Sequence, residues 1–246
     1  MADPLKYYGN NTCVTRNLLE ACTTCGVENF IFSSTAAVYG TPKELPATEA
    51  TPTLPINPYG RSKLMVESIL ADVAATGKLR YIALRYFNVA GADPDGSLGQ
   101  ATPEATHLIK VACEVACGKR SHIDVFGSDY PTPDGTCVRD YIHVMDLGRA
   151  HILALEHLLK GGASEIMNCG YGHGFSVSEV LRSVMKVSGK TLDIRMTSRR
   201  AGDPAALTAD ATRLRTLLHW TPQLDNLDTI CKTAYDWEVK WQSPTP

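Results

Sequence analysis

Hydrophobic residues at the start of the chain keep the spacing of an amphipathic helix. Asp3 and Pro4 are typical of a helix start, and Gly26 is typical of a helix end. The pattern therefore predicts that the chain opens on one helix. Its apolar positions are Leu5, Tyr8, Leu18, Leu19, Cys22 and Cys25.

Short apolar runs and helical stretches alternate along the rest of the chain. Each apolar run is long enough for a strand buried on both faces, and Ser176 with Glu179 has the form of a capping box. This alternation predicts an α/β fold with a parallel sheet. Strands are expected at 29–34, 81–88, 123–127, 165–170 and 192–196. Helices are expected from Tyr59 to about Thr76, and at 103–118, 145–160, 176–189, 210–218 and 226–242.

Composition and charge narrow the class of protein. The chain has 246 residues, of which 44% are hydrophobic and 20% charged, as in an ordinary globular protein. A formal net charge of -2 provides no basic field for nucleic acid, and no apolar stretch approaches the ~18 residues of a membrane span. The first residues lack a secretory signal, so a cytoplasmic location is expected.

Two cysteine spacings raise the question of a metal site. Cys22 and Cys25 form a C-x-x-C, while Cys113 and Cys117 lie one helical turn apart. Both pairs lie on apolar helical faces without the turn-rich knuckle typical of zinc sites. We therefore expect free thiols and no metal.

The segment "INPYGRSKLMVE" (56–67) places Tyr59 and Lys63 four residues apart at the start of a helix. This spacing puts both side chains on one helical face. An ammonium group near a phenol favours the phenolate, so the pair is suited to base chemistry. The same spacing also occurs by chance on surface helices, so the pair alone is a weak signal.

Longer motifs in the sequence indicate a functional role for Tyr59 and Lys63. "FSSTAAVYG" (32–40) and "RYFN" (85–88) lie at the carboxyl ends of two expected strands, where open α/β sheets bind ligands. Together with "YGRSK" (59–63) they resemble the extended short-chain dehydrogenase/reductase family. "DVFGSDYPTPDGTCVRDYIHVMDL" (124–147) and "RRAGDPAALTADA" (199–211) narrow the resemblance to the UDP-glucose 4-epimerases, and it covers essentially the whole chain.

The related sugar 4,6-dehydratases are the nearest alternative. They carry an acidic pair directly after the catalytic threonine, where this chain has Ala36 and Ala37. Without those acids, elimination of water has no obvious proton donor and acceptor. Dehydration is therefore disfavoured.

The resemblance implies NAD as cofactor and inversion at C4 of a UDP-hexose through a 4-keto sugar. It implies Thr35, Tyr59 and Lys63 as the catalytic residues, with Tyr59 as the base. One cation ~5 Å from the phenol contributes about 3.3 kcal/mol at an effective dielectric of ~20, whereas a pKa near 7 requires about 4 kcal/mol. Lys63 alone therefore cannot lower the Tyr59 pKa to about 7, and the positively charged oxidised cofactor is expected to supply the rest of the free energy. The implied cofactor-binding residues are Asn10, Ser33, Tyr59, Lys63 and Tyr86.

The implied substrate site requires arginines, because guanidinium binds phosphate oxygens with two hydrogen bonds. Arg139 and Arg200 would hold the diphosphate, Asp203 the ribose, and Phe126 and Leu108 the uracil. The full implied set is Thr35, Asn88, His107, Leu108, Phe126, Arg139, Arg200 and Asp203. His107 and Leu207 differ from the asparagine and larger aromatic residue of the best-known sugar epimerases. Because leucine at position 207 is smaller than that aromatic residue, the sugar pocket would have room for a 2-acetamido group. UDP-N-acetylglucosamine therefore stays an alternative to UDP-glucose.

A glycine-rich turn for the cofactor pyrophosphate, G-x-x-G-x-x-G, occurs nowhere in the chain. We therefore expect an incomplete Rossmann-like parallel sheet, with the strands at 29–34 and 81–88 short of partners. Residues 1–90 would form the later part of the NAD-binding domain. Residues 91–246 would form mainly a smaller α/β nucleotide-sugar-binding domain, with about 140–170 returning to the first.

Two functions follow from this incompleteness. In the first, the chain is part of an epimerase that is active as the full gene product and forms a homodimer. In the second, it is a non-catalytic fragment that binds UDP-sugar or pairs with another subunit.

Overall fold

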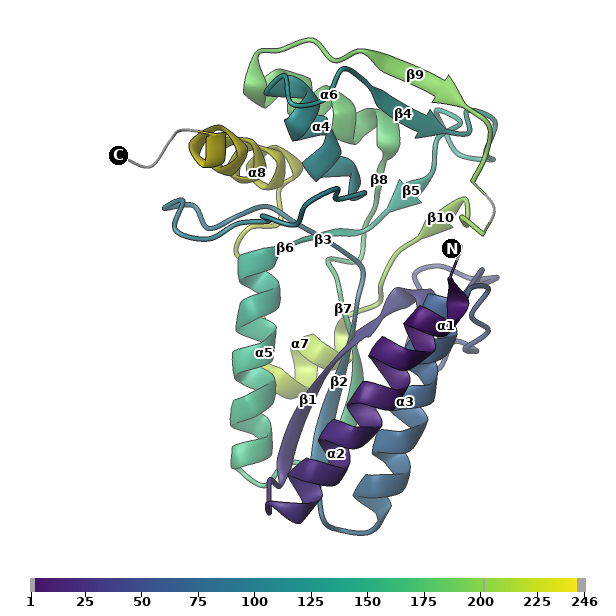
Figure 1. The fold of residues 1–246 in the computed structure, drawn as a ribbon, viewed down its shortest axis with the longest axis vertical. Coiled ribbons are helices and arrows are strands. Elements are labelled where there is room, and N and C mark those ends of the chain that lie inside the picture. The colour runs from purple at the N-terminus through teal and green to yellow at the C-terminus, as the bar shows by residue number, and fades with distance from the viewer. Residues whose placement is uncertain (1–2, 201, 243–246) are drawn as a thin grey trace. The chain divides into compact units, whose positions relative to one another are not determined.

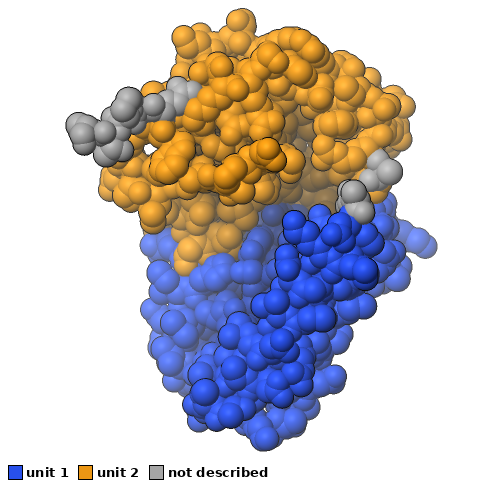
Figure 2. Space-filling model, in the orientation of Figure 1, with its two compact units in different colours: residues 1–87, 149–172, 209–221 blue, residues 88–148, 173–208, 222–246 orange. Residues whose placement is uncertain are grey.

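A computed structural model describes residues 3–200 and 202–242, which divide into two compact units. Unit 1 consists of the described residues of 1–87, 149–172 and 209–221. Unit 2 consists of those of 88–148, 173–208 and 222–246 (Figure 2). The chain thus passes between the units several times.

Unit 1 contains a parallel sheet in the order β1-β2-β7 (Figure 1). The strands are β1 (Asn29–Thr35), β2 (Arg80–Tyr86) and β7 (Glu165–Cys169), which confirms three of the predicted strands within two residues. β2 pairs on both sides, so the expectation that it would be short of partners is wrong. Among the described residues, β1 pairs with β2 alone.

The opening helix is continuous but not uniform. It consists of α1 (Pro4–Tyr7), a π-helical segment (Tyr8–Cys13) and α2 (Val14–Thr24). Asp3 caps it by accepting a hydrogen bond from the backbone N–H of Lys6, which confirms the predicted start. The π-helical segment was not predicted, because hydrophobic spacing does not distinguish one extra residue in a turn.

Helix α3 (Pro58–Ala75) brings Tyr59 into its first turn. Asn57 caps the helix, since its side chain accepts a 2.8 Å hydrogen bond from the Gly60 backbone, and Pro58 occupies the first helical position. In Figure 1, α2 and α3 lie side by side over one face of the sheet. Asn11 and Ser62 join the two helices by a side-chain hydrogen bond of 2.9 Å.

The core between these helices and the sheet is apolar. It comprises Leu19, Phe32, Val66, Leu70, Leu79, Tyr81 and Ala83, all of them buried. Ile82 and Leu84 alternate with the β2 members of this cluster, and they are buried on the opposite face of the strand. The sheet is therefore covered on both faces, as its continuous apolar strands predict.

Replacing Leu70 with alanine is expected to lower the free energy of unfolding by about 2–5 kcal/mol. The side chain is fully buried at the centre of this core, so truncation removes apolar burial and leaves a cavity. Urea denaturation followed by circular dichroism measures the change. Leu54→Ala is the control, because Leu54 is 70% exposed and its truncation should change the value by less than about 0.5 kcal/mol.

Two further helices contribute to unit 1. α5 (Val144–Leu159) enters it at Arg149, and α7 (Thr212–Leu218) packs beside β7. Ala150, Ala154 and Leu158 form the fully buried face of α5. Both helices were predicted, with ends that differ by at most two residues.

Unit 2 is built from short paired strands and three packed helices. The strands are β3 (Asn88–Ala90) with β6 (Tyr141–His143), β4 (Ile123–Phe126) with β9 (Ile194–Thr197), and β5 (Val138–Arg139) between β8 (Phe175–Ser176) and β10 (Ala206–Leu207). The helices are α4 (Leu108–Ala116), α6 (Val177–Ser188) and α8 (Leu227–Gln242), which pack against one another (Figure 1). The Ser176–Glu179 capping box is present as predicted.

One predicted boundary in unit 2 is wrong. The helix expected from residue 103 begins at Leu108, with His107 as its N-terminal flanking residue. Glu104 has a φ of 51°, in the left-handed region, so the backbone before His107 cannot continue the helix. This late start leaves 103–107 as a loop.

The described helices include none that is both long and apolar enough to cross a membrane. Within the described ranges, no group of three or more histidine, cysteine or acidic side chains could hold a metal ion. The eight cysteines are free thiols.

Candidate active site

The side chains of Thr35 and Tyr59 meet in unit 1. Thr35 is the last residue of β1, and its hydroxyl accepts a 3.2 Å hydrogen bond from the Ala37 backbone N–H. The Thr35 side chain also lies close enough to the Tyr59 phenol to favour the phenolate, and this interaction by itself lowers the phenol pKa. The two residues are 24 positions apart in the chain, so the sheet edge and the start of α3 bring them together.

Lys63 lies one turn further along α3. Its ammonium Nζ donates a 3.0 Å hydrogen bond to the Ser33 carbonyl and lies 5.9 Å from the centre of the Tyr59 ring. Burial lowers the pKa of Lys63 because the charged form is less well solvated. The contact with Ser33 directs one N–H of the ammonium to the backbone and leaves two for other acceptors.

The Tyr59 pKa does not follow the sequence-based expectation. We expected Lys63 to favour the phenolate, but the pKa of Tyr59 is raised above its ordinary value. Burial is the largest cause, because it penalises the phenolate, and the nearby Thr35 side chain opposes this rise only in part. Tyr86 and Tyr7 raise the pKa further.

The raised Tyr59 pKa predicts a loss of stability in alkali. Above pH ~10 the unfolded phenol loses its proton while the folded one keeps it, so the free energy of unfolding falls as pH rises through this range. The contribution is fully present below pH ~10. Urea denaturation at pH 8 to 11 measures it, and Tyr59→Phe should show a shallower decline than the parent chain. Identical profiles for the two chains would contradict this assignment.

The other implied cofactor residues lie in the same unit. Tyr86 ends β2 and pairs in register with Thr35, and Ser33 supplies the carbonyl that holds Lys63. Asn10 is exposed in the π-helical segment. Tyr7, which sequence reasoning missed, packs edge-on against Tyr59 with ring centres 6.1 Å apart. Helical spacing places Tyr7 on the opening helix but carries no signal for this contact.

Unit 2 contains a separate cavity of ≈ 690 Å³. The seven implied substrate residues of this unit all line it, although they come from five different segments of the chain. They are Asn88, His107, Leu108, Phe126, Arg139, Arg200 and Asp203. Leu207 is buried in β10 and is not among the lining residues.

The cavity is suited to an anion. Four cationic side chains line it against two carboxylates, so its balance is positive. Arg139 lies 3.6 Å from the Asp203 carboxylate, and the guanidinium of Arg200 lies 4.1 Å from the centre of the Phe126 ring. These contacts hold both arginines in place.

Some lining residues were missed by sequence reasoning. Lys119, Arg120 and His122 follow α4 and add positive or titratable groups to the cavity wall. The basic stretch "GKRSH" (118–122) is the signal that marks them. His107 forms a 2.9 Å contact from its Nδ1 to the Gln100 side-chain amide, which fixes the orientation of its ring.

The fold and these two groups of residues define an α/β enzyme of the short-chain dehydrogenase/reductase class. More narrowly, the chain belongs to the NAD dependent epimerase/dehydratase family, whose model matches residues 1–170.

Relatives of known structure and sequence extend this result. The UDP-glucose 4-epimerase of Azospirillum brasilense is 57% identical over 235 residues, which are 96% of this chain and 68% of that protein. The UDP-Glc/GlcNAc 4-epimerase of Campylobacter jejuni is 54% identical with a TM-score of 0.81, over 98% of this chain and 73% of that one. The Bifidobacterium longum UDP-glucose 4-epimerase, solved with NAD+ and UDP, is 43% identical with a TM-score of 0.91, over 97% and 72%. The chain thus spans about 70% of these relatives.

Proposed function

We propose that the chain inverts the configuration at C4 of a UDP-hexose, interconverting UDP-glucose and UDP-galactose with NAD. The observation that carries this proposal is the proximity of the Thr35 side chain to the Tyr59 phenol, with the Lys63 ammonium 5.9 Å from the centre of the Tyr59 ring. Tyr59 is the proton acceptor and Lys63 the cation, both on helix α3, and Thr35 at the end of β1 guides the proton.

The unit 1 residues fit the nicotinamide end of NAD. Lys63 has two N–H groups beyond its bond to Ser33, which suit the ribose hydroxyls of a nucleotide. The glycine-rich turn that would receive the cofactor pyrophosphate is not in this sequence. We therefore assign Asn10, Ser33, Tyr59, Lys63 and Tyr86 to the nicotinamide end alone.

The residues of unit 1 transfer the proton of the sugar C4 hydroxyl. When bound, NAD supplies a hydride acceptor and donor for C4 of the sugar. Tyr59 takes the proton of the C4 hydroxyl, Thr35 holds the C4 oxygen, and Lys63 adds positive charge beside the phenol. Because burial raises the Tyr59 pKa, the phenol becomes a good base only with a further positive charge nearby.

We assign the unit 2 cavity to the UDP part of the substrate. Arg139 and Arg200 bind the diphosphate, Asp203 accepts from the ribose, and Phe126 and Leu108 flank the uracil. Asn88 and His107 contribute polar contacts from the same wall. The positive balance of the cavity supports this assignment, since the diphosphate carries two negative charges.

Dehydration of the sugar is not part of the proposal. Thr35 is followed by Ala36, which is buried, and by Ala37. Neither can donate or accept a proton, so the elimination of water lacks its acid and base at this position.

The sugar preference is tested with two galacto-configured substrates. Purified chain, saturated with NAD, is given UDP-galactose or UDP-N-acetylgalactosamine, and kcat/KM is measured for each. Conversion of UDP-galactose supports the proposed function, and its absence at saturating NAD contradicts it. A comparable kcat/KM for the acetylated sugar would add that class of substrate. A strong preference for UDP-galactose would exclude a sugar pocket enlarged by leucine at position 207.

We also propose that two chains pair through α1, α2 and α3. Leu5, Leu18 and Met65 are exposed on these helices, at 77%, 49% and 46% of their accessible surface. Pairing would remove these apolar side chains from water, which favours association. Sedimentation equilibrium tests the pairing: a dimer that dissociates on Leu18→Glu supports it, and a monomeric parent chain contradicts it.

A further inference from the structure

A row of buried polar side chains crosses the sheet of unit 1 next to Thr35. Ser34, Arg85 and Asn168 lie side by side in the register of β1, β2 and β7. They are only 0%, 4% and 0% exposed, respectively. The next row toward the carboxyl ends contains Thr35 and Tyr86, so the polar row lies directly beneath the candidate catalytic edge.

Glu67 of α3 joins this row to the helix that carries Tyr59. Its carboxylate accepts hydrogen bonds from Arg85 at 2.9 Å (Nε) and 2.6 Å (Nη2). The Ser34 hydroxyl donates to the same carboxylate at 2.5 Å. Glu67 therefore ties β1 and β2 to α3 at a point one turn after Lys63 and two turns after Tyr59.

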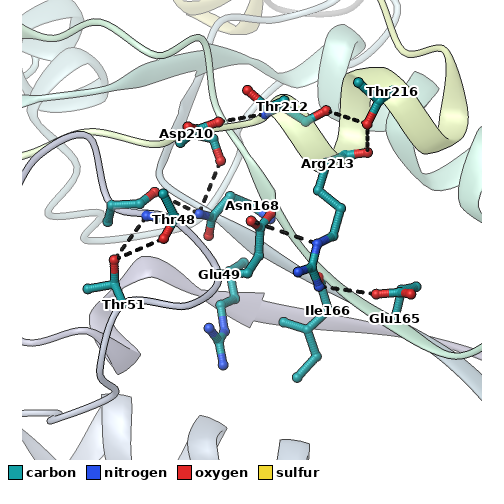
Figure 3. Close-up of polar contacts among 12 residues, drawn as sticks. Thr48, Glu49, Thr51, Glu165, Ile166, Asn168, Asp210, Thr212, Arg213 and Thr216 are labelled. Atoms are coloured by element: carbon teal, nitrogen blue, oxygen red, sulfur yellow. Dashed lines mark hydrogen bonds and ion pairs between the residues drawn. The ribbon is translucent and has the colours of Figure 1, made fainter.

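The other end of the row fixes the segment that follows Thr35. Arg85 Nη1 donates to the Tyr39 hydroxyl at 3.1 Å, and that hydroxyl donates to the Asn168 side-chain oxygen at 2.6 Å. The Asn168 amide in turn donates to the Ala47 and Asp210 carbonyls at 2.8 and 3.2 Å. Figure 3 shows Asn168 held between Asp210 and the loop of Thr48, Glu49 and Thr51.

These contacts hold Thr35 from both sides. Ser34 precedes it and Tyr39 follows it by four residues, while Glu67 belongs to the helix of Tyr59. We propose that Glu67 and Arg85 are positioning residues, whose buried ion pair, linked to Ser34 and Tyr39, sets β1 against α3 so that Thr35 reaches the Tyr59 hydroxyl. The inference rests on the proposed function, in which Thr35 and Tyr59 act as a pair.

Stability alone does not account for this ion pair. Both side chains are at most 5% exposed, and taking two charges out of water costs free energy that their attraction only partly offsets. Apolar residues of similar size often give an equally stable core. What such residues cannot provide is the set of directed hydrogen bonds that fixes Ser34 and Tyr39.

The test is the pKa of the Tyr59 phenol, followed by NMR of the intact chain labelled with ¹³Cζ-tyrosine. Tyr59→Phe identifies the signal, and Thr35→Val gives the pKa without the threonine hydroxyl. The double variant Glu67→Leu/Arg85→Met removes both charges together, so neither is left buried and unpaired. We expect its Tyr59 pKa to rise by about 0.5 to 1 pH unit toward the Thr35→Val value.

A Tyr59 pKa in the double variant equal to that of the parent would overturn the proposal, and so would a Thr35→Val variant with no rise. Should the double variant fail to fold, Tyr39→Phe keeps both charges and removes only the hydroxyl that joins Arg85 to Asn168. It should give a smaller rise, and no rise overturns the proposal.

Leu214→Ala is the control that distinguishes loss of the Thr35–Tyr59 positioning from a general loss of stability in unit 1. Leu214 is fully buried on α7 in the same unit, so this variant loses stability without touching the polar row. Its Tyr59 pKa should equal that of the parent, and an equal rise would overturn the proposal. None of these measurements uses NAD or a UDP-sugar. A chain that lacks epimerase activity but shows the predicted rise would refute the proposed function alone.

Discussion

Replacing Tyr59 with phenylalanine is expected to lower kcat for UDP-galactose by about 10²- to 10⁴-fold, the range associated with loss of one acid–base group. The change removes only the hydroxyl, so the ring keeps its contacts with Tyr7 and the Lys63 ammonium. Thr35 still holds the C4 oxygen, but no group beside it can take the proton. The affinity for UDP should stay the same, because the residues assigned to UDP all line the cavity of unit 2. Steady-state turnover with saturating NAD and calorimetric titration with UDP measure the two quantities.

Tyr81→Phe is the matched control for this variant. Tyr81 is a buried tyrosine of unit 1, and burial raises its pKa as it raises that of Tyr59, but it belongs to the apolar core. Its variant should keep the parent turnover within a factor of about three, which corresponds to less than ~1 kcal/mol. If Tyr59→Phe kept more than a tenth of the parent kcat, Tyr59 would not be the base.

Replacing Arg139 with methionine is expected to weaken UDP binding by about 30- to 100-fold. Loss of a hydrogen-bonded charge opposite phosphate corresponds to roughly 2–3 kcal/mol. The substitution also leaves the Asp203 carboxylate, now 3.6 Å from the guanidinium, without its neighbouring cation in a cavity that must accept a diphosphate. Both effects lower affinity. Calorimetric titration with UDP measures the change and requires no cofactor.

Arg195→Met is the control for this charge change. Arg195 lies on β9 of the same unit, more than half exposed and paired with Asp193 at 2.9 Å, and it does not line the cavity. Its loss should alter UDP affinity by less than about twofold, since exposed charges are screened by solvent. Equal losses in the two variants would mean that net charge, rather than the Arg139 contact, governs binding.

The sequence predicted the elements whose signals are local. Asp3 and Asn57 cap helices with their own side chains, and Ser176 with Glu179 forms a box within four residues, so helix starts at these positions are recognisable. The buried strands of unit 1 were recognisable from their unbroken apolar runs. These features depend on neighbours in the chain.

Features that depend on distant parts of the chain were not predictable in the same way. The sign of the Tyr59 pKa shift is set by burial among residues from several elements, and the spacing to Lys63 carries no information on that burial. The Ser34, Arg85 and Asn168 row depends on strand register, which the apolar runs leave open. The start of α4 depends on the left-handed backbone at Glu104, an uncommon conformation for this residue type.

The resemblance to a family supplied the substrate residues that spacing could not. Arg139, Arg200 and Asp203 lie in segments without a common local signal, yet all three line one cavity. The additional cations Lys119 and Arg120 lie outside the motifs that carry the resemblance, so it did not mark them as cavity residues. A structure is needed to show which basic side chains share a surface.

The fate of the hydrogen at C4 tests the proposed reaction most directly. The chain, saturated with NAD, is incubated with UDP-galactose carrying deuterium at C4, and the products are observed by ¹H and ²H NMR. We expect UDP-glucose that retains the deuterium at C4, because in the proposed reaction this hydrogen leaves and returns without exchanging with water. Unchanged UDP-galactose, loss of deuterium to solvent, or a product from which water has been eliminated would contradict it.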